Sequence, residues 1–207
     1  MDTLAALSRG APAAALLLAA IVLTSLAGLF VAPALIERNL LRPYWLQRRR
    51  EHLTLITSGF IHADLGHLFF NGFTFWAFAF SLERHIGTAG FVLLYTFGLL
   101  VSGAGTWLRH RREPGYQCLG ASGAILAVLF AFIVHFPGAS LYVMFIPLPI
   151  PAPLFAVAYV AFSVHASRQN RGRVNHDAHL SGALAGVVFV AASDPEAFVR
   201  AWRQLAG

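Results

Sequence analysis

Long uncharged stretches alternate with short arginine-rich ones along this chain. Residues 11–36, 86–108 and 114–167 contain no Asp, Glu, Lys or Arg. About 20 apolar residues cross a bilayer as a helix, and the third stretch is long enough for two crossings and a loop. The pattern therefore predicts an all-α bundle that crosses a membrane several times.

Splitting the chain at charges, prolines and glycines predicts six transmembrane helices in a single membrane domain over residues 1–207, with no soluble domain and no internal repeat. The segment FPGASLYVMFIPLPIPAP, between the fourth and fifth spans, cannot form one continuous helix, because each Pro lacks a backbone donor and clashes with the preceding turn. The predicted spans are approximately 12–35, 62–82, 89–108, 118–136, 151–167 and 177–194.

The first span has one feature of a cleaved signal peptide, since the letters VAPA place small residues near its end. Its uncharged run of 26 residues, however, exceeds the roughly 7–15 of a signal-peptide core, and Arg9 is the only basic residue before it. We expect the segment to be retained as a membrane span.

Composition agrees with a membrane protein. Hydrophobic residues make up 57% of the chain and charged residues 12%, against about 25% charged in soluble domains. All 15 basic residues are arginines, and they lie mostly in short loops between spans, which indicates contact with lipid headgroups and not with nucleic acid. The single cysteine, Cys118, excludes an internal disulfide.

Polar residues gather near one end of three spans. The second, fourth and sixth spans run in the same direction, so their N-terminal ends lie on the same side of the membrane. A polar group in a membrane is costly unless it has a partner, and this cluster therefore predicts a functional site. Its members are His62, His67, Asn71, Ser122, His176 and His179.

Ser122 is the candidate nucleophile of this site. It lies in CLGASGAIL between Gly120 and Gly123, so little bulk covers its hydroxyl. A serine hydroxyl becomes a strong nucleophile only when a nearby base takes its proton, and His179 lies at matching depth on the sixth span.

Two further spacings fit acyl transfer. Gly182 and Gly186 are four residues apart, which favours close packing of the fourth and sixth spans. His67 and Asn71 are also four apart and share a helix face, so their N–H groups could stabilise an oxyanion. Asp177 points to another face of the sixth span than His179, and we expect it to cap that helix.

The strings HADLGHLFFN, GASG and AHLSG, in this order on the second, fourth and sixth spans, resemble the rhomboid family of intramembrane serine proteases, in particular the six-span bacterial type. The resemblance implies Ser122 as nucleophile, His179 as general base and no carboxylate in the dyad. It also implies oxyanion donors at His67 and Asn71 and a structural role for His62. It implies neither a cofactor nor a metal, and its substrates are transmembrane proteins.

Two features depart from the family pattern. Many members have a tyrosine four residues after the nucleophile that packs against the histidine, and this chain has Leu126 there. The loops on the site's side carry eleven arginines against four on the other, which predicts a cytoplasmic site. The family instead opens its site to the cell exterior. We follow the family and expect a multi-pass protein of the bacterial inner membrane.

Alternatives remain at this stage. A rhomboid-like protein without proteolytic activity could bind membrane partners. Two features favour it: Leu126, and Leu53-Thr54 where many members of the family have Trp-Arg. A transporter or a zinc site is disfavoured, because the chain has neither a repeat nor an HExxH string. Cys118 is a rival nucleophile. The physiological substrate, a specialised role in trimming C-terminal sorting tails and the oligomeric state stay open.

Overall fold

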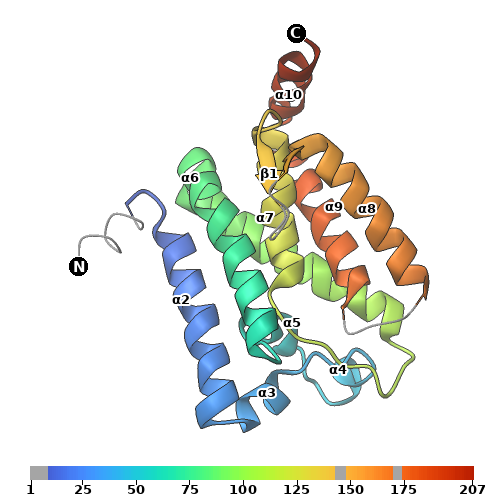
Figure 1. Cartoon of the computed structure of the whole chain (residues 1–207). Helices are drawn as coiled ribbons and strands as arrows, with labels where there is room; N and C mark the ends of the chain where they lie inside the picture. Colours follow the sequence, from blue (N-terminus) through green and yellow to red (C-terminus); the bar gives the residue numbers. More distant parts are fainter. Residues whose placement is uncertain (1–8, 143–147, 170–173) are drawn as a thin grey trace.

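The computed structural model describes residues 9–142, 148–169 and 174–207. Its long helices lie side by side in a bundle, with short helices at one end and the C-terminal helix at the other (Figure 1). The helices are α2 (Pro12–Leu26), the π-helix η1 (Ala27–Val31), α3 (Ala34–Asn39), α4 (Trp45–Arg48), α5 (Thr54–Thr57), the 3-10 helix η2 (Ser58–Phe60), α6 (Leu65–His110), α7 (Ser122–His135), α8 (Ala152–Gln169), α9 (His176–Ser193) and α10 (Glu196–Ala206).

Helix α2 begins at a buried carboxylate. The Glu83 side chain accepts hydrogen bonds from the backbone N–H groups of Ala13 (3.0 Å) and Ala14 (2.6 Å) and from the Thr88 hydroxyl (2.8 Å). The first N–H groups of a helix have no partner within the helix, and the helix dipole favours a negative charge there. Glu83, which is fully buried, therefore fixes the start of α2 against the middle of α6.

Helix α6 contains the second and third predicted spans. The two halves meet at Gly87, where φ is 78° and ψ is 158°, so the helical backbone is interrupted there. Only a residue without a Cβ adopts this positive φ readily. This interruption lies between residue 82, where the second span was predicted to end, and residue 89, where the third was predicted to begin.

Helix α7 lies in the middle of the bundle (Figure 1), and ten of its 14 residues are buried. Its closest neighbour is α9. A Cβ added to Gly182 would clash with the carbonyl of Gly123, and one added to Gly186 would clash with the carbonyl of Ala127. This close approach confirms the predicted packing role of Gly182 and Gly186.

The loop between the first two spans is folded at the same end as the start of α7 and contains α3, α4 and α5. Leu41 in this loop pairs with Cys118 through two backbone hydrogen bonds, of 2.9 and 3.0 Å. Cys118 was predicted to open the fourth span, but α7 begins at Ser122 because residues 118–121 are held in this paired loop.

The proline-rich segment before α8 is not one helix. Its described parts include two short antiparallel strands, in which β1 (Ser140–Tyr142) pairs with β2 (Pro149–Pro151). Helix α10, which the sequence analysis did not predict, follows α9 at a bend of 105°.

Membrane crossing is supported for part of the chain by helix length and composition. Among the described residues, Pro12–Val31 and Leu65–His110 are long and apolar enough to span a membrane, and the bent pair α9 and α10 adds a third if it is counted as one span. The total of six spans stays a prediction. His62 was placed on the second span, but it precedes α6, which starts at Leu65.

Candidate active site

His62, three residues before the start of α6, is the centre of a buried hydrogen-bond network. Its Nε2 lies 2.8 Å from the amide nitrogen of Asn71, and its Nδ1 lies 3.0 Å from the Ser25 hydroxyl on α2. Because an amide nitrogen can only donate, Nε2 accepts and Nδ1 carries the proton. The Ser25 hydroxyl in turn lies 3.2 Å from the carbonyl of Phe60. His62 thus joins α2 to α6 and orients Asn71, as expected of a structural residue.

His67 and Asn71 face the loop that precedes Ser122. A Cβ added to Gly120 would lie 2.7 Å from Cε1 of His67 and 3.7 Å from the amide nitrogen of Asn71. Gly120 also has a φ of +116°, which disfavours any residue with a Cβ. The predicted shared face of His67 and Asn71 is therefore present and is turned toward GASG.

The main chain before Ser122 is held from two sides. The N–H of Gly120 donates to the carbonyl of Ser58 at 2.9 Å, and Cys118 is paired with Leu41. The N–H of Ala121 is directed at Nε2 of His62 at 3.5 Å. These contacts fix the position of Ser122 at the first turn of α7, where its side chain is half-buried.

His179 lies on α9 beside the start of α7. The contact between Gly182 and Gly123 brings the two backbones together, and His179 is one helical turn before Gly182. The carbonyl of Ala178 also faces Gly123. Ser122 and His179 are thus adjacent to the same crossing point, on helices that start at the same end of the bundle (Figure 1).

Sequence analysis missed Tyr159 on α8. Its hydroxyl lies 2.8 Å from Nδ1 of His179, and the two rings stack with centroids 6.4 Å apart and an interplanar angle of 30°. Leu126 has no aromatic ring, and Tyr159 supplies a ring to His179 from a different helix. The sequence could have identified Tyr159, because a tyrosine hydroxyl inside an apolar span needs a hydrogen-bond partner.

The predicted capping role of Asp177 is wrong. Asn175 is the residue whose side chain accepts from the N–H of Ala178, at 3.0 Å. The Asp177 carboxylate instead contacts Nε2 of His110 at 3.1 Å and accepts from the Ser167 hydroxyl at 2.7 Å. It therefore connects the ends of α6 and α8 to the start of α9.

Cys118 is poorly suited to act as a nucleophile. Burial raises the pKa of its thiol to about 11, and the reactive form of cysteine is the thiolate. At neutral pH the thiol is protonated. Its backbone, paired with Leu41, contributes to the position of Ser122.

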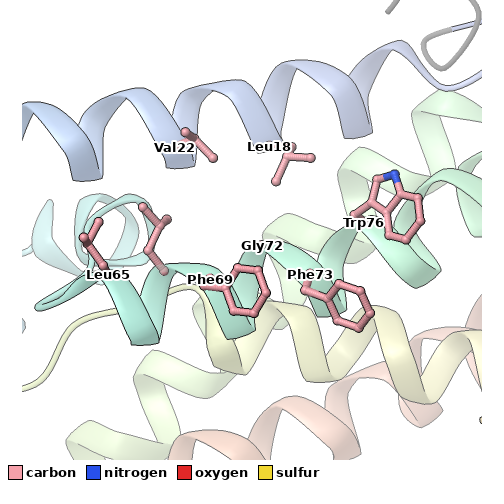
Figure 2. Close-up of a pocket in the computed structure, with 8 residues that line it drawn as sticks. Leu18, Val22, Leu65, Phe69, Gly72, Phe73 and Trp76 are labelled. Atoms are coloured by element: carbon pink, nitrogen blue, oxygen red, sulfur yellow. The ribbon is translucent and has the colours of Figure 1, made fainter. Parts of the chain in front are cut away.

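An apolar groove lies away from these polar groups, between α2 and the first half of α6 (Figure 2). Its volume is about 510 Å³, and apolar side chains such as Leu18 of α2 and Phe69 of α6 line it. It offers no nucleophile or base. A much smaller cavity of about 30 Å³ lies beside Ser122, and its walls include the polar residues Ser58, Ser102 and Thr106.

In the part of the chain that the structure describes, no three His, Cys, Asp or Glu side chains are arranged to hold a metal ion.

Comparison with known proteins identifies a family. Residues 49–193 match the model of the Rhomboid domain. The chain is 31% identical over 153 residues to RHOMBOID-like protein 12, mitochondrial, of Arabidopsis thaliana, which covers 65% of this chain and 44% of that protein. It is 29% identical over 140 residues to Rhomboid protein 1, mitochondrial, of Saccharomyces cerevisiae, with coverages of 66% and 40%.

A human relative, Presenilin-associated rhomboid-like protein, mitochondrial, is 29% identical over 138 residues, with coverages of 66% and 36%. The chain thus spans less than half the length of each of these relatives. All three names place the relatives in mitochondria, so they give no support to the predicted bacterial inner membrane.

Proposed function

Since this chain belongs to the rhomboid family, we propose that it is an intramembrane serine endopeptidase that cleaves transmembrane proteins in or near their membrane segment. The observation that supports the proposal is the close crossing of α7 and α9 at Gly123 and Gly182, since Ser122 directly precedes Gly123 and His179 lies one helical turn before Gly182. Family membership alone leaves proteolytic activity open.

The proposed reaction is acyl transfer. Nε2 of His179 takes the proton of the Ser122 hydroxyl as its oxygen attacks the scissile carbonyl, and the imidazolium then protonates the leaving amine. The N–H groups of His67 and Asn71 stabilise the negative oxygen. Asn71 has two amide N–H groups, so one remains available beside the hydrogen bond to His62.

Hydrolysis of the acyl-enzyme needs water inside the membrane. The cavity beside Ser122 is about 30 Å³, enough for a water molecule, and its polar walls offer hydrogen-bond partners. Two further points belong to the proposal: the chain sits in a cell membrane with lipid around it, and its substrates have small residues at the cleavage point and a helix that unwinds easily.

Cleavage of a transmembrane model substrate by purified protein in detergent tests this function. We expect Ser122→Ala and His179→Ala each to lower kcat by about 10³-fold or more, because removing either member disables the pair. Matched controls are Ser193→Ala and His52→Ala, since both side chains are exposed and outside the site. Both controls should cleave as the wild type does.

Two results would contradict the proposal. If the wild type neither cleaves the substrate nor reacts at Ser122 with a fluorophosphonate, the chain is a non-proteolytic rhomboid-like protein that binds membrane partners. If Ser122→Ala retains activity and Cys118→Ala loses it, the nucleophile is Cys118.

A further inference from the structure

Tyr159 is tightly positioned between three helices. Its ring stacks on Phe155, one turn earlier on α8, with centroids 5.7 Å apart, and it meets Phe130 of α7 edge-on at 6.1 Å. Its hydroxyl then lies 2.8 Å from Nδ1 of His179 on α9. The two aromatic contacts restrict the ring, so the hydroxyl is held at this nitrogen.

A histidine base in this position has a definite hydrogen-bonding need. A neutral imidazole carries one N–H and one lone pair. For Nε2 to accept the Ser122 proton, the imidazole proton must be on Nδ1, and inside a membrane that N–H must find an acceptor. The nearby carboxylate of Asp177 is bonded to His110 and Ser167 instead.

We propose that Tyr159 is a positioning residue that accepts a hydrogen bond from Nδ1–H of His179 and so selects the tautomer in which Nε2 is a base. This inference rests on the proposed function of His179. Tyr159 would act as the third member of the catalytic group, but from a helix that carries neither the nucleophile nor the base.

A phenol suits this role in a membrane better than a carboxylate does. The carboxylate of a soluble serine protease holds its histidine through a charged hydrogen bond, and burying that charge in an apolar region is costly. The tyrosine hydroxyl is neutral and can accept while its ring packs against apolar neighbours. The stacked ring also limits rotation of His179, a contact that Leu126 cannot supply.

The test separates the hydroxyl from the ring. Tyr159→Phe removes the acceptor and keeps the stacking, whereas Tyr159→Leu removes both. The matched control is Tyr95→Phe, because the buried Tyr95 hydroxyl on α6 has no hydrogen-bond partner among the described residues. We expect kcat to fall about tenfold in Tyr159→Phe with KM unchanged, and further in Tyr159→Leu, while Tyr95→Phe keeps wild-type kcat.

A spectroscopic measurement follows the tautomer directly. In protein labelled with 15N-histidine, the His179 signals are identified by their loss in His179→Gln. Wild-type protein should show His179 with its proton on Nδ1, and Tyr159→Phe should shift the population toward the Nε2–H form. Tyr95→Phe should leave the signals unchanged.

The proposal is overturned if His179 in Tyr159→Phe keeps the wild-type tautomer, or if kcat is unchanged in that variant. Equal losses in Tyr159→Phe and Tyr159→Leu with a raised KM would also overturn it, because they would indicate a substrate contact. The tautomer is measured without substrate, so failure of proteolysis in the wild type would contradict the proposed function and still leave this hydrogen bond tested.

Discussion

At the scale of single residues, Gly120 combines two demands that no other residue type meets. Its backbone is in a region of positive φ, and the ring of His67 occupies the space that a Cβ would need. His67, a proposed oxyanion donor, can approach the loop before Ser122 this closely only because position 120 has no side chain.

On the proposed function, we expect Gly120→Ala to lower proteolytic activity by about 10²-fold or more, because the added Cβ displaces the ring of His67 from the proposed oxyanion position. The measurement is kcat together with the apparent melting temperature. Gly87→Ala is the matched control: its φ is +78°, but nothing lies within 4 Å of the added Cβ.

Both variants carry backbone strain of about 1–2 kcal/mol. Gly87→Ala should therefore lose stability while each folded molecule keeps its activity. Equal activity in the two variants would show that the space around Gly120 is not needed for the reaction.

The sequence predicted the positions of single residues where both members of a spacing lie on the same helix. The four-residue spacing of His67 and Asn71 gave their shared face, and the spacing of Gly182 and Gly186 gave the close helix crossing. Tyr159 was missed because its partner is on another helix, and no spacing within one segment reveals which hydroxyl reaches Nδ1 of His179.

At the scale of helices, the ends depend on partners distant in sequence. Helix α2 starts where Glu83 accepts its first N–H groups, and α7 starts at Ser122 because Leu41 holds Cys118 in a backbone pair. Hydrophobic runs locate the helices, but such pairings decide their first residues. For α10, the apolar stripe of Val199, Trp202 and Leu205 alternates with charges, so a search for uncharged runs does not find it.

Removal of the Glu83 carboxylate should destabilise the protein more than any exposed charge does. We expect Glu83→Ala to cost roughly 2–4 kcal/mol, because it leaves buried N–H groups of α2 without an acceptor. Glu83→Gln, which keeps one acceptor oxygen, should cost less. The apparent melting temperature in detergent is the measurement.

The control for this prediction is Glu196→Ala, whose side chain is 85% exposed. It should leave the melting temperature nearly unchanged. A melting temperature for Glu83→Ala equal to that of Glu196→Ala would mean that the start of α2 does not depend on this carboxylate.

At the scale of the whole molecule, the bundle has two distinct ends. The start of α7, the start of α9 and the folded loop with α3 to α5 lie at one end, and α10 lies at the other (Figure 1). The arginine count predicts that the first of these ends faces the cytoplasm. The family resemblance predicts that it faces the cell exterior. The site's own geometry is compatible with either side.

Single cysteines in a Cys118→Ala background resolve the orientation. Following the family resemblance, we expect Arg112→Cys to react with a membrane-impermeant maleimide outside intact cells and Arg203→Cys to react only after permeabilisation. Both side chains are exposed. Arg112 follows the end of α6 at His110, which contacts the start of α9, and Arg203 is on α10 at the other end of the bundle (Figure 1). The reverse pattern would favour the arginine count, and labelling of both from one side would contradict the placement of the two ends.

The bond between Glu83 and α2 also sets an order of events during synthesis. The chain is made from its N-terminus, so the N–H groups of Ala13 and Ala14 leave the ribosome about 70 residues before their acceptor does. Until then these groups must keep a substitute partner, such as water or a lipid headgroup, because an unsatisfied group is costly in the apolar layer. The first helix can therefore take its final depth only after the second helix has been made.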